Sequence, residues 1–253
     1  MRQDQHSIAA LSRSLAMLEA ILTDREGRGV AAIAAELGLP RATAYRQVAS
    51  FLHEGFLRRL PNGRLVAGPR LLALGQAIDP RQVIVAAAAP VLHRLAAHLG
   101  CVVQLGTLDN DMVTYRIKTG RGAGDFFTRV GLQLEAYCTG IGKVLLAHLP
   151  ERERQAYLDT GPFPALTAKT ITDPAHLRAT LEDVRRDDFA RDDEEIAEGL
   201  VCLAVPIRSA DGTVAAAISA SRSTAVAHRR SEAEMLAALH EAAAQIEAVI
   251  AAG

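Results

Sequence analysis

Residues 30–46 read VAAIAAELGLPRATAYR, and this stretch decides the fold of the first part of the chain. It begins with a short Ala-rich helix, Val30 to Leu37, which Gly38 ends because glycine readily takes the left-handed conformation found after helices. Pro40 suits the first position of a second helix, where its missing amide hydrogen costs nothing. That helix extends to about Glu54. Two helices joined by so short a turn are typical of a helix-turn-helix.

The second of these helices has an apolar face and a basic face. Its core positions are Ala44, Val48 and Phe51 or Leu52, which recur three or four residues apart. Arg41, Tyr45 and Arg46 therefore lie on the outer face. A helix that enters the DNA major groove needs cationic and hydrogen-bonding side chains on such a face.

A helix precedes this pair and a hairpin follows it. From Ile8 to Leu22, apolar residues recur with the period of an amphipathic helix. Two extended runs, Phe56–Leu60 and Arg64–Ala67, flank Pro61-Asn62-Gly63, and Asn-Gly tolerates the positive φ angles of a tight hairpin turn. Three helices and an arginine-bearing hairpin predict a winged helix-turn-helix domain over residues 1–70.

Seven residues are candidates for DNA contact. They are Arg41, Thr43, Tyr45 and Arg46 on the helix, and Arg58, Arg59 and Arg64 on the wing. We expect Arg41 and Tyr45 to contact base edges and the other five to contact mainly phosphates. Residues 1–70 carry a net charge of +4 and the remainder −5, which suits double-stranded DNA as a partner of the first part only. The alternative is a solvated basic face.

The remainder of the chain predicts a second domain over residues 81–253, joined by a helical linker over residues 71–80. An Ala-rich helix over residues 81–99 should kink or break at Pro90. Strand-like runs occupy 101–108, 112–118, 126–136, 200–208 and 213–221, and helices are expected at 142–148, at 151–158, from Asp173 and from Ser231. Because strands adjoin strands as often as helices, the fold class is α+β with a mainly antiparallel sheet.

Composition excludes several classes of protein. No run approaches the roughly 20 continuous apolar residues of a membrane span, and the first residues lack the apolar run of a signal peptide, so we expect a cytoplasmic protein. Three cysteines are too few and too far apart for a disulfide framework or a CxxC metal site. We therefore expect no metal and no cofactor.

A glycine segment in the second domain has the properties of a ligand site. Gly140-Ile141-Gly142 lets backbone approach a ligand closely, and the amides at the start of the helix Lys143–His148 can hold an anion such as a small carboxylate. It is not a nucleotide-binding loop, because an earlier glycine is missing and Val144 follows the lysine. Lys143 itself is expected to cap the glycine turn or pair with a carboxylate rather than act as a nucleophile.

Together these features resemble the IclR family of bacterial transcription regulators. The resemblance is carried by Ser14–Glu19, Gly38–Arg46, Gly55-Phe56-Leu57, CTGIGKVLLA at residues 138–147 and DDEEIAEGLVCLAVP at residues 192–206. The chain departs from the family pattern at Asp188-Phe189, where a Gly-Tyr pair is usual, and we expect a local change of turn there.

The resemblance implies a GAF-like effector-binding domain, assembly as a homodimer or homotetramer, and control of a catabolic operon. Carried over from the family, the effector-binding residues are Leu134, Gly140, Ile141, Asp192, Cys202, Ser219 and Ser221. Ser219 and Ser221 are two apart on a strand and so project from one face. Each has a simpler explanation: Asp192 lies in an acidic run that solvent could surround, Cys202 could be a small apolar side chain, and the serines could satisfy backbone groups.

Three hypotheses for function follow. The first is a DNA-binding regulator, not an enzyme, whose operator affinity changes with a small organic or aromatic carboxylate effector. The second is an enzyme that uses the acidic run and Cys202, with the N-terminal part serving for dimerisation. The third is an architectural DNA binder, which predicts no response to a ligand. The sequence has no GxSxG motif and no matched base for Lys143, which weakens the enzyme hypothesis. We therefore favour the first hypothesis.

Overall fold

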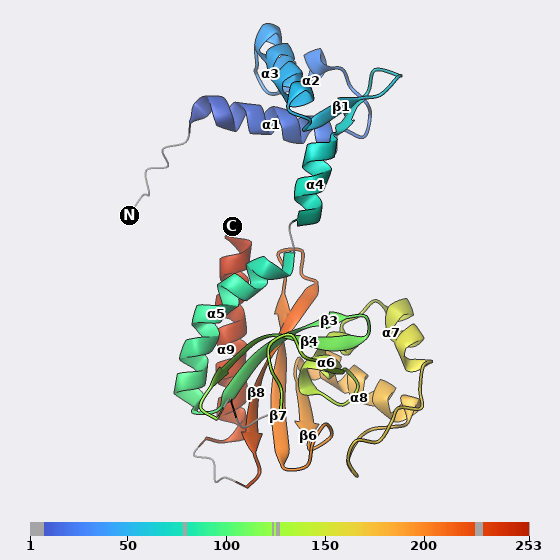
Figure 1. The fold of residues 1–253 in the computed structure, drawn as a ribbon, viewed down its shortest axis with the longest axis vertical. Helices are drawn as coiled ribbons and strands as arrows, with labels where there is room; N and C mark the ends of the chain where they lie inside the picture. The colour runs from blue at the N-terminus through green and yellow to red at the C-terminus, as the bar shows by residue number, and fades with distance from the viewer. Residues whose placement is uncertain (1–7, 78–79, 123, 125–126, 226–229, 253) are drawn as a thin grey trace. The chain divides into compact units, whose positions relative to one another are not determined.

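The computed structural model describes residues 8–77, 80–122, 124, 127–225 and 230–252. By its internal contacts the chain divides into two compact units, residues 1–79 and residues 80–253. The α+β class and the mainly antiparallel sheet that the sequence predicts are confirmed (Figure 1). Each unit has its own buried core.

The N-terminal unit is a winged helix-turn-helix. Its elements are α1 (Ala9–Thr23), α2 (Val30–Glu36), α3 (Arg41–His53), β1 (Leu57–Arg59), β2 (Leu65–Ala67) and α4 (Pro69–Ala77). Met17 and Ile21 of α1, Ile33 of α2 and Ala44 and Val48 of α3 are buried together in one cluster. Gly38 takes φ +64° between α2 and α3, as a residue after a helix should. The core positions predicted for α3 are thus confirmed, with Phe51 and Leu52 packed at the edge of the cluster.

The wing turn differs in detail from the expected Asn-Gly turn. Gly63 takes φ +83°, whereas Asn62 does not take a positive φ. The Gly63 amide donates to the Leu60 carbonyl at 2.9 Å, and the Leu60 amide donates to the Arg64 carbonyl at 2.8 Å. These bonds define a three-residue loop, Pro61-Asn62-Gly63, with one left-handed glycine. The fixed φ angle of Pro61 suits the second position of a type I turn, which is the usual start of such a loop.

The C-terminal unit contains a six-stranded antiparallel sheet with helices on both faces. The strand order is β5-β4-β3-β8-β7-β6. The strands are β3 (Val102–Asp109), β4 (Met112–Gly120), β5 (Gln133–Glu135), β6 (Ala190–Asp193), β7 (Leu200–Arg208) and β8 (Val214–Ser223). The helices are α5 (Pro80–Leu99), α6 (Gly140–Ala147), α7 (Glu151–Leu158), α8 (Pro174–Asp187) and α9 (Glu232–Ala251).

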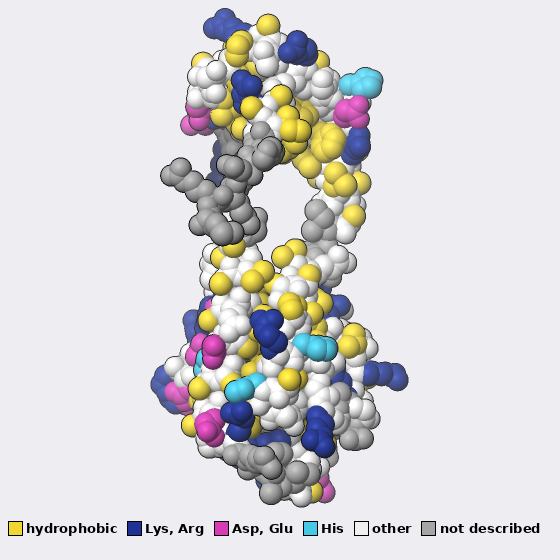
Figure 2. Space-filling view, turned by 90° about the vertical axis from the view of Figure 1, so that its left-hand side faces the viewer, with side chains coloured by type: hydrophobic (Ala, Val, Ile, Leu, Met, Phe, Trp, Pro, Cys, Tyr) yellow, Lys and Arg dark blue, Asp and Glu magenta, His cyan; other side chains and the backbone are white. Residues whose placement is uncertain are grey.

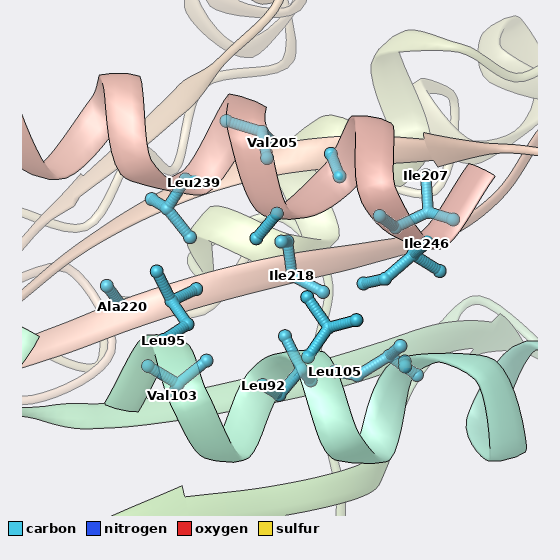
Figure 3. Close-up of a cluster of buried hydrophobic side chains, with 14 of the residues drawn as sticks. Leu92, Leu95, Val103, Leu105, Val205, Ile207, Ile218, Ala220, Leu239 and Ile246 are labelled. Carbon is cyan, nitrogen blue, oxygen red and sulfur yellow. The ribbon is translucent and has the colours of Figure 1, made fainter. Parts of the chain in front are cut away.

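Two hydrophobic clusters lie on opposite faces of this sheet. In one, Leu92 and Leu95 of α5 and Leu239 and Ile246 of α9 pack against the strands (Figure 3). The other lies beneath α6, α7 and α8. Alternate residues of β7 divide between them, since Leu203, Val205 and Ile207 face the α5–α9 side and Ala204 faces the α6 side. Both faces of the central strands are therefore buried.

Several local expectations need correction. The extended run 126–136 contains only the three-residue strand β5, with Phe126 outside the described residues, because this segment pairs in register only with residues 112–114 at the start of β4. Of the two alternatives at Pro90, a break is wrong: helix α5 continues through it, with residues on both sides of Pro90 packed against the sheet. Helix α6 begins at Gly140, two residues earlier than expected, because Thr139 caps it.

The aspartate at the departure from the family pattern occupies a glycine-like position. Asp188 follows α8 and takes φ 60° and ψ 26°, which is the left-handed conformation. Its carboxylate accepts two hydrogen bonds from Arg208, at 2.6 and 3.2 Å. Aspartate is one of the few residues that tolerate this conformation, so the change from glycine does not require a different turn.

One stretch, residues 69–99, has the length and apolar composition to cross a membrane. It covers α4 and α5 and is rich in alanine and leucine. On α5, Ala88, Leu92 and Leu95 are buried against the sheet. Core helices commonly share this composition, so the stretch is weak support for a membrane span.

Candidate functional site

The outer face of α3 is basic and exposed. Arg41 and Arg46 are exposed, Tyr45 is 55% exposed, and Thr43 is half-buried. Within the part of the chain that the structure describes, the guanidinium groups of Arg41 and Arg46 make no hydrogen bond or ion pair. They are thus uncommitted, with the buried Ala44 on the opposite side of the helix.

The wing arginines continue this surface. Arg58 and Arg59 are exposed on β1, and Arg64 follows the wing turn. Arg59 donates to the Gly63 carbonyl at 3.2 Å, and Arg64 donates to the Asp24 carbonyl at 3.4 Å. Tyr45 of α3 lines the same hollow of the N-terminal unit as Arg59 and Arg64. Tyr45 of α3 and these two wing arginines therefore share one surface, whereas Arg58 does not line this hollow.

A small cavity lies in the C-terminal unit between the sheet and the start of α6. Its lining is Gln104, Tyr115, Phe127, Thr128, Thr139, Gly140, Ile141, Asp192, Ile196, Leu200, Cys202, Ser219 and Ser221. Six of the seven residues carried over from the family are brought together here. Leu134 is not in the lining, because it lies on the edge strand β5 and packs against the cluster beneath α6.

Four polar residues of the lining were missed by the sequence analysis. Gln104, Tyr115, Thr128 and Thr139 come from separate parts of the chain, and only the sheet topology unites them. Gln104 could have been singled out from the sequence, because it is a lone amide side chain in the apolar run of β3. In the sheet it pairs directly with Ser219 of β8.

The polar side chains on the sheet side of the cavity form a short network. Gln104 Nε2 donates to Thr128 Oγ1 at 2.7 Å, and Ser221 Oγ donates to Gln104 Oε1 at 3.3 Å. The Cys202 sulfur lies 3.1 Å from Ser221 Oγ. All four side chains are buried, so the network fixes their orientation toward the cavity.

Asp192 is completely buried, which rules out a solvated acidic run as its environment. Its Oδ1 atom accepts a hydrogen bond from the Glu195 amide at 2.8 Å. Its Oδ2 atom has no hydrogen-bond partner among the described residues. Burial raises the pKa of this carboxyl to about 7, against the opposing effects of the Glu195 amide and Lys143.

Lys143 is also buried and forms an ion pair with Glu195. Its Nζ atom donates to Glu195 Oε1 and to the Arg191 carbonyl. The expectation that Lys143 pairs with a carboxylate is thus confirmed. Because the Lys143 ammonium group is engaged in these contacts, it is not available as a free cation to a ligand in the cavity.

The first turn of α6 forms one wall of the cavity. Thr139 Oγ1 accepts a hydrogen bond from the Gly142 amide at 3.1 Å, while the Gly140 and Ile141 amides have no partner among the described residues. A Cβ atom on Gly142 would lie 2.1 Å from the Ala136 carbonyl oxygen. Gly142 therefore allows α6 to approach the preceding segment.

Comparison with known families covers both units. Residues 10–61 match the IclR helix-turn-helix domain, and residues 76–248 match the bacterial transcriptional regulator IclR C-terminal domain. The chain belongs to the IclR family. The family model for the second domain alone spans most of the chain, so membership does not depend on the helix-turn-helix.

Curated IclR-family relatives align over most of their lengths. The Pca regulon regulatory protein of Pseudomonas putida is 30% identical over 221 residues, which cover 86% of this chain and 75% of that protein. The regulator XynR of Escherichia coli K12 is 30% identical over 223 residues, which cover 86% of this chain and 87% of that protein.

Solved IclR structures share the fold. An IclR homolog from Microbacterium hydrocarbonoxydans, complexed with 4-hydroxybenzoate, is 28% identical with a TM-score of 0.64, and the match covers 97% of this chain and all of that one. The Thermotoga maritima IclR is 27% identical with the same TM-score and coverage. As an IclR-family protein, the chain is a DNA-binding transcription regulator with an effector-binding domain.

Proposed function

We propose that α3 and the wing bind operator DNA, with Arg41 and Tyr45 at base edges and the remaining candidates at phosphates. The observation that carries this proposal is the exposed face of α3, on which the guanidinium groups of Arg41 and Arg46 have no partner within the described ranges. Uncommitted cationic groups on a recognition helix are available to phosphates and base edges. Thr43 on the same helix is half-buried, and we assign it to a phosphate of the DNA backbone.

Binding to the DNA upstream of the protein's own gene tests this role. We expect specific binding that weakens steeply with salt and is lost in the double variant Arg41→Ala, Arg46→Ala. The matched control is Arg185→Ala, Arg186→Ala, which removes the same charge from exposed positions on α8. Equal losses in both variants, or no specific binding at any salt concentration, would contradict the proposal.

The cavity beside α6 is proposed as the effector site, and the effector as a small organic acid, aromatic acids included. Support comes from the unpaired Gly140 and Ile141 amides, which suit a carboxylate, and from the neighbouring structure complexed with 4-hydroxybenzoate. The space at the centre of the cavity is about 10 Å³, room for about one water molecule. Binding therefore requires side chains of the lining to move apart. Thermal unfolding with a panel of carboxylates tests this assignment.

The N-terminal unit has an exposed apolar stripe that suits self-association. Ile8, Leu11 and Leu15 at the start of α1 are 69%, 55% and 54% exposed, and Leu72 and Leu74 of α4 are also exposed. Figure 2 shows apolar side chains gathered on the surface of this unit. We propose that the α1 stripe of Ile8, Leu11 and Leu15 is covered by a second copy of the chain in a homodimer or homotetramer. Light scattering of Leu11→Gln, Leu15→Gln should then give a smaller species than the unchanged chain.

Pairing of two N-terminal units predicts a roughly palindromic operator with half-sites spaced by whole helical turns. By analogy with the Pca regulator, the controlled genes are proposed to be a catabolic operon, and the site of action the cytoplasm. A catalytic role for the cavity is disfavoured, because burial raises the pKa of the Cys202 thiol and leaves little reactive thiolate. The protein is therefore proposed to act by binding alone.

A further inference from the structure

A second hollow of the C-terminal unit lies at the C-terminal end of α6, away from the cavity beside the first turn of that helix. It measures about 470 Å³ and is bordered by the β3–β4 turn, α6, α7 and the start of β8 (Figure 1). Among the described residues, the linings of the hollow and the cavity have no member in common. We call it the α7 hollow. Its volume falls within the range of about 300–1,000 Å³ that is usual for small-molecule sites.

Most side chains that line the α7 hollow are apolar. Tyr157 contributes its ring, because its hydroxyl oxygen is engaged as the acceptor of a hydrogen bond from the Tyr137 amide at 3.2 Å. The aliphatic members of the lining are Leu108, Leu145, Leu149, Ala156, Val214 and Ala215. Leu108, Leu149 and Val214 are only half-buried, so this apolar surface is partly open to solvent. Covering it with the apolar part of a ligand is favourable, because that removes the surface from water.

The charged groups of the α7 hollow differ in whether they have partners. Arg81 lines the hollow, but its guanidinium group forms an ion pair with Asp109 at 2.6 Å. Asp111 and Glu153 are exposed members of the lining, and their carboxylates make no hydrogen bond or ion pair among the described residues. The hollow therefore combines an apolar surface with two carboxylates that are available to a positively charged ligand.

The backbone of the β3–β4 turn holds Asp111 in place. Asn110 and Asp111 take φ 50° and 66°, between Asp109 and Met112, which pair at the end of the two strands. Two-residue hairpin turns with positive φ at both positions match the twist of the strands and favour asparagine and aspartate. Burial raises the pKa of the Tyr157 phenol, and the nearby Asp111 charge adds to this increase. The Asp111 carboxylate thus lies close to the aromatic part of the lining.

We propose that the α7 hollow is a second ligand site, which binds a small organic cation: an amine with an aromatic or aliphatic body. The body covers the apolar lining, and the ammonium group faces the carboxylates of Asp111 and Glu153. A carboxylate ligand, the class proposed for the cavity beside α6, would meet two like charges here. The two sites therefore differ both in position and in the charge of the ligand.

The charge preference is expected to be modest, because both carboxylates are exposed. Ion pairs at the surface are weakened by water and by salt. An amine should therefore bind about fivefold more tightly than a neutral alcohol of the same shape, and this difference should shrink at high salt. The apolar body supplies the rest of the affinity, which salt should not weaken.

Calorimetric titration of the full chain with tryptamine and tryptophol tests the proposal. These two probes share an indole ring on a two-carbon arm and differ only in the end group, an ammonium in one and a hydroxyl in the other. We expect both to bind and tryptamine to bind about fivefold more tightly at low salt. Neither probe carries a carboxylate, so their binding does not depend on the proposed carboxylate effector.

A charge variant and a matched control test the role of the two carboxylates. Asp111→Asn, Glu153→Gln should lower the affinity for tryptamine to that for tryptophol and leave tryptophol binding unchanged. Asparagine tolerates the left-handed conformation at position 111. The control Glu182→Gln, Glu198→Gln neutralises two exposed carboxylates outside the lining and should leave both affinities unchanged.

A bulky substitution locates the site independently of charge. Ala156 is exposed on α7 and lines the hollow, so Ala156→Trp places an indole ring where the ligand body should lie. We expect this variant to lose binding of both probes while it unfolds at nearly the same temperature as the unchanged chain. Because the position is exposed, the larger side chain does not have to enter the core.

The outcomes separate this proposal from the proposed effector site. Equal affinities of tryptamine and tryptophol, or failure of tryptamine to bind, overturns the proposal and leaves the carboxylate site beside α6 in place. Tryptamine binding that survives in Asp111→Asn, Glu153→Gln but is lost in Asp192→Asn would assign the amine to that cavity and also overturn the proposal. A smaller assembly of Ala156→Trp in light scattering, without amine binding to the unchanged chain, would assign the hollow to a second copy of the chain instead.

Discussion

Lys143 and Glu195 form an ion pair in which the two side chains are 2% and 7% exposed. The pair joins α6 to the segment that follows β6. A buried contact therefore links the two segments that contribute Gly140, Ile141 and Asp192 to the candidate effector site. Removing one partner of a buried ion pair is costly, because the charge that remains is neither paired nor hydrated.

Removing the lysine charge should strongly destabilise the C-terminal unit. For Lys143→Met we expect the free energy of unfolding in urea to fall by about 3–5 kcal/mol, because Glu195 is left buried and unpaired. The double variant Lys143→Met, Glu195→Leu should recover much of this loss. Lys169→Met is the control, since the half-exposed Lys169 pairs with Asp193 and Glu194 at the surface and its loss should cost far less. Equal effects of the two single variants would contradict the buried pair.

The two glycines at the start of α6 should differ in their tolerance of alanine. A Cβ atom on Gly142 meets the Ala136 backbone, and we expect Gly142→Ala to cost about 1–3 kcal/mol or more. Gly140→Ala places its Cβ 3.3 Å from that of Ala204, a contact that a small shift relieves, so its cost should be smaller. Thermal unfolding of the pair measures the difference, and the reverse order would show that α6 does not approach Ala136 in this way.

The left-handed position after α8 can be examined with two substitutions of Asp188. Both Asp188→Gly and Asp188→Ala remove the ion pair with Arg208, which is partly exposed and worth at most about 1 kcal/mol. Only alanine also has to adopt φ 60°. We expect alanine to be less stable than glycine by about 1 kcal/mol in urea unfolding. Equal stabilities would mean that this residue does not hold the left-handed conformation.

The raised pKa of Asp192 predicts a pH dependence of stability. The folded carboxyl has a pKa of about 7, against an ordinary value of 3.8, so the folded state binds its proton more tightly than the unfolded state. Stability relative to Asp192→Asn should therefore fall as pH rises from 4 to 7, by about 1.4 kcal/mol per pH unit at most, and stay level above pH 7. Urea unfolding of both proteins at pH 5, 6, 7 and 8 measures the difference. Parallel curves would place the pKa of Asp192 near its ordinary value.

Local signals in the sequence predict much of the fold. Helices are expected from Asp173 and from Ser231, and in the structure each of these residues caps its helix, α8 and α9, with Glu234 completing a capping box at Ser231. These features depend only on residues a few positions apart, as does the turn at Gly38. The overextended prediction for residues 126–136 failed because strand pairing, which the local sequence does not contain, decides how much of a segment becomes a strand.

The cavity was less accessible to sequence reasoning. Ser219, Ser221, Asp192 and Cys202 entered through resemblance to a family, and local spacing united only the two serines. Gln104 lies opposite Ser219 because β3 pairs with β8, more than 100 positions away in the chain. Side chains that meet through such pairings carry no common local pattern, so the network around Gln104 becomes visible only with the topology.

The most direct test of the central claim is the affinity for operator DNA measured by fluorescence anisotropy, with and without an acid at a concentration that calorimetry shows to saturate the chain. If one molecule couples effector binding to DNA binding, the dissociation constant should change by about fivefold or more. An unchanged dissociation constant at full occupancy of the cavity would contradict the account, because ligand and DNA would then bind independently.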